Sequence, residues 1–135
     1  MATTIEGALK AYVQAATAVS SIVSSRVYFL EAPQDPTFPY VVFFCVDDPH
    51  NALYYGGTSF NSGTARYQFS CFAKEDMMAG LNLQNAIINR LRWTTGTQQG
   101  FNIERITILD VRQRRDPDIE HVTISDVDAR VEYYE

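Results

Sequence analysis

One apolar run, from Tyr40 to Val46, constrains the fold of this chain more than any other segment. Prolines stand before it at positions 33, 36 and 39, and each one biases the preceding residue toward extended backbone. Residues 31–39 are therefore predicted to form an extended strap that crosses a helix layer and leads into a strand. Alternate side chains of that strand point to opposite faces, and both sets are apolar, so we expect both faces to be covered.

Two amphipathic helices are predicted from apolar residues at helical spacing. The first spans about residues 4–19 and begins at a capping box formed by Thr3 and Glu6. The second begins at Asp76, which can cap it. Its apolar stripe is predicted to consist of Met77, Leu81, Ile87, Ile88 and Leu91.

Three further strands are predicted from alternating apolar residues. One alternates cleanly over Ala65–Cys71, one spans about residues 103–113, and the last spans about residues 122–134. The alternation breaks at Ile108-Leu109, which predicts either a bulge or a change in what covers the strand.

These elements follow one another in the order αββαββ. They predict an α+β fold in one domain of residues 1–135, with a single-layer, mainly antiparallel four-stranded sheet packed on two helices. Each helix has one apolar stripe, so we expect both helices on one face of the sheet and a neighbouring subunit on the other. The predicted core includes Phe43, Cys45, Phe69, Leu81 and Ile88.

A long connection is predicted between Asp47 and Gly63, ending in a flexible glycine-rich tip. It contains Tyr54, Tyr55 and Phe60, and aromatic residues beside glycines in a loop are typical of contact surfaces. The alternative is that these three residues fold back as a lid on the core. The tip has no lysine and no following helix start, so it does not fit a phosphate-binding loop.

No pattern in the sequence indicates catalysis, a metal or a cofactor. The two histidines lie in predicted loops, and the two cysteines are interpreted as small buried hydrophobic residues. Asp116, Asp118 and Glu120 alternate as at the start of a calcium loop, but the required Gly and Glu are absent from positions six and twelve. We therefore expect no enzyme activity.

The net charge of −5 argues against a nucleic-acid binder, which normally carries a basic excess. Arg112, Arg114 and Arg115 are followed directly by acidic residues, which favours a local salt bridge or a subunit contact. Tyr133 and Tyr134, in the last predicted strand, are further candidates for an interface. No apolar run approaches the 20 or so residues that cross a bilayer and no leader pattern is visible, so we expect a soluble protein made in a cytoplasm.

Several short motifs resemble, in order and spacing, the tail completion (tail terminator) proteins of long-tailed bacteriophages. The similarity extends from about residue 5 to residue 92. The motifs are Arg26-Val27-Tyr28, Ala32-Pro33-Gln34, Pro39-Tyr40-Val41-Val42, Arg66-Tyr67-Gln68 and Cys71-Phe72-Ala73.

The resemblance implies a virion structural protein, assembled in the host cytoplasm, that forms a ring, typically a hexamer. Such a ring caps the tail tube, stops its polymerisation and provides the head-joining surface, so its partners are the tail tube protein and a head–tail connector protein. It implies no catalytic residue, no cofactor, no membrane and no specific nucleic-acid binding, although DNA passes through the ring. A head–tail neck protein or another minor tail protein remains an alternative, as does a small α+β ligand-binding or RNA-binding domain.

Overall fold

The structure, a computed structural model, describes residues 4–47, 50–55, 58–75, 77–92, 94–98 and 100–134, with side chains except those of residues 50–63 and 98. In this part of the chain there are three helices, α1 (Ile5–Gln14), α2 (Thr17–Val23) and α3 (Met77–Leu91). The seven strands of the same part are β1 (Val27–Phe29), β2 (Tyr40–Asp47), β3 (His50–Tyr55), β4 (Thr58–Lys74), β5 (Gly96–Gln98), β6 (Phe101–Arg115) and β7 (Val122–Tyr134).

The strands form one curled mixed sheet in the order β1-β2-β4-β7-β6-β5, with β3 paired to β4 outside that path. The α+β class is confirmed, but the predicted four-stranded antiparallel sheet and the order αββαββ are wrong. Strands β1, β3 and β5 were not predicted, and β1 pairs with β2 in parallel. Strands β1 and β5 have only three residues each, too few for their alternation to be read from the sequence.

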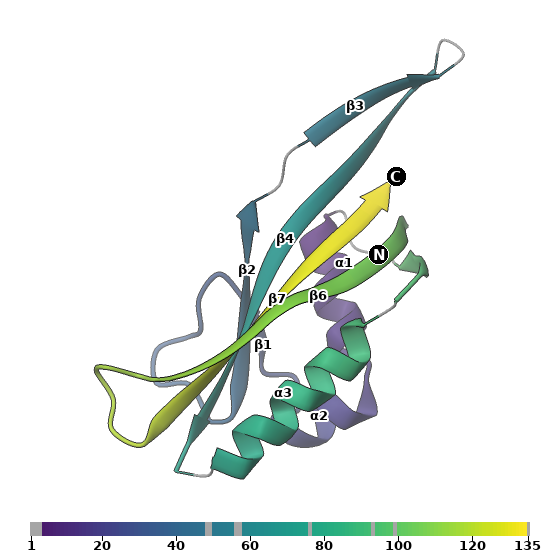
Figure 1. Cartoon of the computed structure of the whole chain (residues 1–135). Helices are drawn as coiled ribbons and strands as arrows, with labels where there is room; N and C mark the ends of the chain where they lie inside the picture. Colours follow the sequence, from purple (N-terminus) through teal and green to yellow (C-terminus); the bar gives the residue numbers. More distant parts are fainter. Residues whose placement is uncertain are drawn as a thin grey trace.

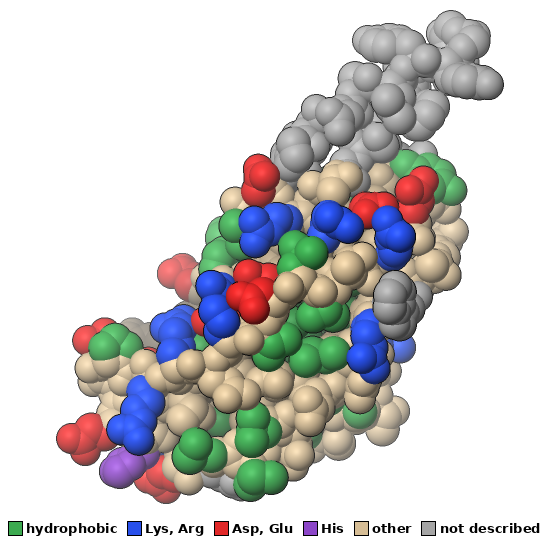
Figure 2. Space-filling view, in the orientation of Figure 1, with side chains coloured by type: hydrophobic (Ala, Val, Ile, Leu, Met, Phe, Trp, Pro, Cys, Tyr) green, Lys and Arg blue, Asp and Glu red, His purple; other side chains and the backbone are tan. Residues whose placement is uncertain are grey.

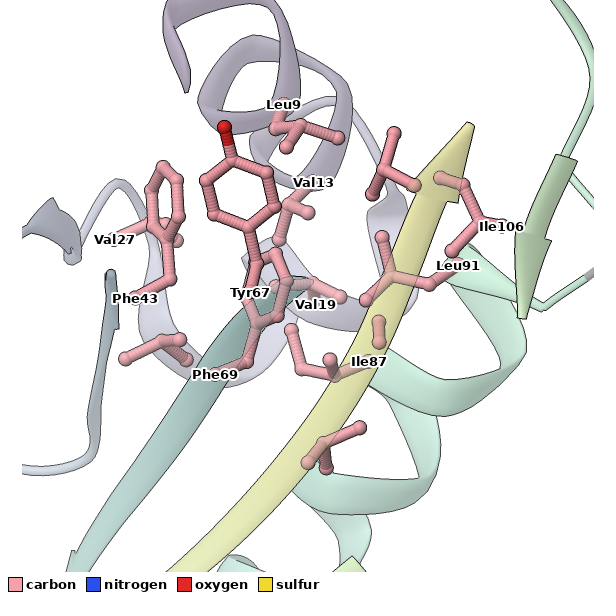
Figure 3. Packing of buried hydrophobic residues seen from close by; sticks show 14 of the residues in the cluster. Leu9, Val13, Val19, Val27, Phe43, Tyr67, Phe69, Ile87, Leu91 and Ile106 are labelled. Atoms are coloured by element: carbon pink, nitrogen blue, oxygen red, sulfur yellow. The ribbon is translucent and has the colours of Figure 1, made fainter. Parts of the chain in front are cut away.

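All three helices lie on one face of the sheet, as predicted (Figure 1). Phe43 of β2 and Tyr67 and Phe69 of β4 point toward Leu9 and Val13 of α1 (Figure 3). The rings of Phe43 and Phe69 stack with centroids 5.0 Å apart. The core predictions for Phe43 and Phe69 are confirmed, whereas Cys45, Leu81 and Ile88 are only half-buried.

The predicted first helix is interrupted between α1 and α2, where Ala16 is extended. Val13 and Val19, six residues apart, would point about 120° away from each other on one continuous helix. The interruption lets both side chains be fully buried in the core. The N-cap is Thr4, whose side chain accepts a hydrogen bond from the Gly7 N–H at 3.1 Å, and the predicted cap residue Thr3 lies outside the described residues.

The apolar stripe of α3 differs from the predicted one at its start. The buried residues are Gly80, Leu83, Gln84, Ala86, Ile87 and Leu91. Met77 is exposed because the helix meets the sheet one turn later, where Gly80 packs against Ala73 of β4. The predicted cap Asp76 lies outside the described residues.

The strap does not cross the helix layer; it lies on the other face of the sheet. The ring of Phe38 packs on Tyr40 with centroids 5.1 Å apart, and the Lys74 ammonium lies 5.9 Å from its centroid. Tyr40 in turn stacks on Phe72 at 4.7 Å. Burial raises the pKa of the Tyr40 hydroxyl, and Asp116 and Tyr28 raise it further. The strap thus packs on the second apolar face of β2 at Tyr40, whereas Phe44 is half-buried and Val46 is exposed further along that face.

The segment predicted as a long loop is a hairpin of β3 and β4. Tyr55 is opposite Thr58 in the register, and the pairing continues to His50 and Gly63. Beyond Ser62, β4 no longer pairs with β7, so β3 and residues 58–61 of β4 form a two-stranded arm, which projects from the body (Figure 1). The sequence signal was the Gly56-Gly57 pair between two strand-like runs, a common hairpin connection.

Candidate functional site: surfaces for assembly

The face of the sheet opposite the helices carries a layer of arginine and carboxylate side chains. Arg66 of β4 and Arg112 and Arg114 of β6 lie above two aspartates of β7, Asp126 and Asp128. The aspartates are only 4% and 6% exposed, whereas the arginine side chains are about half exposed. Blue and red side chains are interspersed along the strands in Figure 2, so no large area of one charge forms there.

The ion pairs on this face run diagonally across the strands. Arg112 stands opposite Asp126 in the register but pairs with Asp128 at 3.3 Å, and Arg114 pairs with Asp126 at 2.9 Å. Diagonal neighbours on adjacent strands are within reach of long side chains. The Ser70 hydroxyl adds a 2.7 Å hydrogen bond to Asp126, so this carboxylate is held from two strands.

The outer edge of β6 is open along most of its length. Strand β5 pairs only with residues 101–103 of β6, and no other described strand pairs with residues 104–115 on that side. Bulges lie between Ile103 and Arg105, and between Ile108 and Asp110, so the bulge predicted at Ile108-Leu109 is confirmed. Bulges and charges hinder unselective pairing at an open edge, which leaves this edge available to a specific partner.

Apolar side chains are exposed where α3 begins. Met77 and Met78 are 66% and 62% exposed, and Ile119, in the turn between β6 and β7, is exposed beside them. Hydrophobic side chains gather over the start of α3 in Figure 2. A groove of about 210 Å³ between α3 and the sheet is lined by Met77, Leu81, Gln113, Thr123 and Ser125, among others. A second groove of about 580 Å³, which Ile119 also lines, adjoins it at Met77, Arg115 and Thr123.

The candidate interface residues from the sequence fall in three places. Arg112 and Arg114 lie on the face of the sheet opposite the helices, which we call the uncovered face. Their partners there are Asp110, Asp126 and Asp128, and not the acidic residues Asp116 and Asp118 that follow them in the sequence. Arg115 lines the two grooves beside α3.

The two terminal tyrosines lie in different environments. Tyr133 is buried in the core against Phe101, and Tyr134 is 37% exposed on the face opposite the helices. Tyr133 therefore stabilises the single chain. Tyr54, Tyr55 and Phe60 are in the arm, and their side chains lie outside those that the structure describes.

The described residues contain no group of three or more His, Cys, Asp or Glu side chains that could hold a metal ion. The Asp116 carboxylate accepts hydrogen bonds from the N–H groups of Asp118 and Ile119, at 2.8 and 3.3 Å, and so stabilises the turn. Cys71 is fully buried, and burial, followed by the charge of Asp126, raises the pKa of its thiol. A raised pKa disfavours the thiolate that a nucleophile needs.

Sequence reasoning missed Asp126 and Asp128 and the exposed methionines. The two aspartates could have been found, because they alternate with the apolar residues of the last strand and face an alternating arginine pair on the strand before it. The exposure of Met77 and Met78 could not, since it depends on where α3 meets the sheet.

Two of the comparisons with known proteins found a match, one for the sequence and one for the fold. The sequence matches the profile of the family described as tail completion protein gp17 over residues 7–132. The fold matches a chain in a solved structure of the virion of a native gene transfer agent particle, with a TM-score of 0.69 and 15% identity. The match covers 99% of this chain and 100% of that one. No curated protein matches the sequence.

The fold and the profile together define a structural subunit of a virion tail. The chain belongs to the tail completion protein gp17 family. That family consists of structural virion proteins rather than a known class of enzyme. Among the described helices, none is long and apolar enough to cross a membrane.

Proposed function

We propose that this chain assembles into a closed ring, a hexamer, that caps the tail tube, stops its polymerisation and provides the surface for joining the head. Its partners would then be further copies of itself, the tail tube protein and a head–tail connector protein. Membership of the tail completion family supports the location of this ring at the end of a tail.

The observation that carries the ring is the extent of strand surface that one chain leaves without a partner. The edge of β6 is open over residues 104–115, and the arm has no third strand among the described residues. Open strand edges must be paired, covered or protected. A contact between two different surfaces of neighbouring copies closes into a ring when its rotation divides the circle.

The balanced charge of the uncovered face favours the proposal of a ring through which DNA passes. Its arginines are paired with carboxylates, and the whole chain is acidic, with a net charge of −5. Affinity for DNA comes mainly from cations that neutralise phosphates. A face with balanced charges therefore suits a lumen that does not retain DNA. Arg112, Arg114 and Tyr134 remain our candidates for contacts on this face.

The test combines mass measurement with an assay of tube growth. Light scattering after size-exclusion chromatography should show a ring-sized species in place of the 15.3 kDa monomer, and electron microscopy should show annuli about as wide as the tail tube. Added to growing tail tube protein, the chain should sit at tube ends and shorten the tubes. A monomer at every concentration that binds no tube would contradict the proposal. Binding to the connector without any effect on tubes would favour a neck protein instead.

A further inference from the structure

The arm carries no charge. Residues 50–63 contain no Asp, Glu, Lys or Arg, although 20% of the whole chain is charged. Three of these residues, Tyr54, Tyr55 and Phe60, are aromatic. An isolated two-stranded ribbon is only marginally stable in water, and an uncharged one with two open edges invites aggregation. The arm therefore requires a surface that covers it, and that surface should also lack a strong charge.

The smaller groove at the start of α3 offers such a surface, whereas the larger one is lined by Glu75, Asp116 and Glu120. Met77 and Met78 are the most exposed large apolar side chains on the helix, and Ile119 extends the apolar area. The smaller groove, of about 210 Å³, exceeds the roughly 150 Å³ that accommodates a benzene ring in a protein interior. Methionine side chains adapt to irregular partners, which suits them to an aromatic surface. Arg114, which also borders the groove, already has Asp126 as its partner, and Arg115, the other charged residue of the lining, is exposed to solvent.

An arm cannot reach the groove of its own chain. The arm lies at the start of β4, and α3 begins three residues after the end of that strand. An extended strand of this length spans roughly 50 Å. Figure 1 accordingly shows the arm and the start of α3 at opposite ends of the molecule. The groove of one copy can therefore be filled only by the arm of another.

We propose that the β3–β4 arm of one copy docks in the groove at the start of α3 of the next copy. The contact joins two different surfaces at opposite ends of the chain, so it is repeated from copy to copy and can close a ring. This inference rests on the proposed ring function and names the contact that builds it.

Two variants test the arm and the groove one at a time. In the arm-less variant, residues 51–61 are replaced by a Gly-Asn-Gly linker, which removes β3 after His50 and residues 58–61 of β4 but retains the part of β4 that pairs with β7. In the groove variant, Met77→Glu and Met78→Glu place two charges in the apolar surface, and acidic residues in the first turn of a helix do not destabilise it. The matched control carries Asn82→Glu and Asn85→Glu, two exposed residues of the same helix. Circular dichroism and melting curves establish that each variant is folded.

Each variant alone should self-associate at least about 30-fold more weakly than the wild type, the loss expected for an interface hot spot. The control should assemble normally. The mixture of the two variants is the decisive sample, because the arm-less chain supplies a groove and the groove variant supplies an arm. One contact, and no more, can then form, so light scattering should show a 1:1 heterodimer and no ring.

Several outcomes would overturn the inference. Folded variants that form the same rings as the wild type, or a mixture that remains monomeric, would exclude the arm–groove contact. Rings that form without the arm but no longer bind tail tubes would show that the arm contacts the tube. The ring function is tested separately by the tube-growth assay with the wild type. If the mixed variants form the heterodimer but the wild type does not cap tubes, the arm–groove contact is retained and the proposed function is rejected.

Discussion

Phe69 is one of the largest fully buried side chains of β4. It is fully buried, and its ring stacks on Phe43. We expect Phe69→Ala to reduce the free energy of unfolding by about 3–5 kcal/mol, because it removes a large buried side chain and leaves a cavity. Urea denaturation measures this loss. Met78→Ala, at an exposed position, should change the free energy by less than about 0.5 kcal/mol.

The two cysteines should differ in reactivity. Cys71 is fully buried and the pKa of its thiol is raised, whereas Cys45 is half-buried. A Cys45→Ser variant, which retains only Cys71, should show no fast reaction with a thiol reagent at pH 8 until denaturant is added. The Cys71→Ser variant is the matched control and should react faster in the native state. Rapid labelling of native Cys45→Ser protein would contradict the burial of Cys71.

At the scale of elements, β6 and β7 are joined across the uncovered face by ion pairs of unequal burial. Asp126 accepts hydrogen bonds from Ser70 and Arg114 and is almost fully buried, whereas Asp110 is exposed beside Arg112. Asp126→Ala should destabilise the fold by about 1–3 kcal/mol, because it leaves buried polar groups without partners. Asp110→Ala should cost less than about 0.5 kcal/mol, as exposed pairs usually do. Similar losses for both variants in urea melts would show that the face is uniformly solvated.

The contact of α3 with the sheet depends on Gly80. A Cβ atom at this position would lie 3.1 Å from the Cβ of Ala73 and 3.6 Å from Oγ1 of Thr123. Gly80→Val should therefore cost about 1–3 kcal/mol through overpacking. Asn85→Val, at an exposed position of the same helix, is the control for placing a β-branched residue in α3 without overpacking, and the gain in helix propensity from replacing Gly makes the comparison conservative. Gly80→Val should therefore melt at a lower temperature than Asn85→Val. Equal melting temperatures would show that α3 lies further from β4 at this position.

How far the sequence predicts these elements depends on their length and regularity. Strands β4, β6 and β7 are long and alternate, and β2 is a continuous apolar run, so buried residues such as Phe43 and Phe69 could be predicted. The short β1 and β5 give no periodic signal, and the parallel pairing of β1 with β2 depends on contacts that only the folded chain makes. The strap was placed on the wrong face because apolar residues on both sides of β2 do not indicate which side the helices cover. The candidate site was predicted least: the alternating pattern that contains Asp126 was overlooked, and the exposure of Met77 arises from tertiary geometry.

At the scale of the whole molecule, the protein should not bind duplex DNA, although six of its nine arginines are on β4, β6 or β7. Arg66, Arg112 and Arg114 are held by Asp126 and Asp128, so they are not free to neutralise phosphates. We expect no binding of labelled duplex by fluorescence anisotropy at 150 mM salt, meaning a Kd weaker than about 10⁻⁴ M, the weak end of non-specific binding.

The carboxylates, rather than the small number of cations, should be what prevents this binding. Asp126→Asn with Asp128→Asn removes two negative charges, which changes the net charge from −5 to −3, and releases the arginines on one face. Asparagine keeps the shape of aspartate and can still accept the Ser70 hydrogen bond, so the fold should be retained. The double variant should bind duplex DNA at 50 mM salt, and its affinity should fall as salt increases, because the contacts are made to phosphates. Asp110→Asn with Glu132→Asn makes the same change in charge with more exposed carboxylates and should bind more weakly. Binding by the wild type at 150 mM salt, or equal binding by the two double variants, would show that charge pairing on the uncovered face does not control contact with DNA.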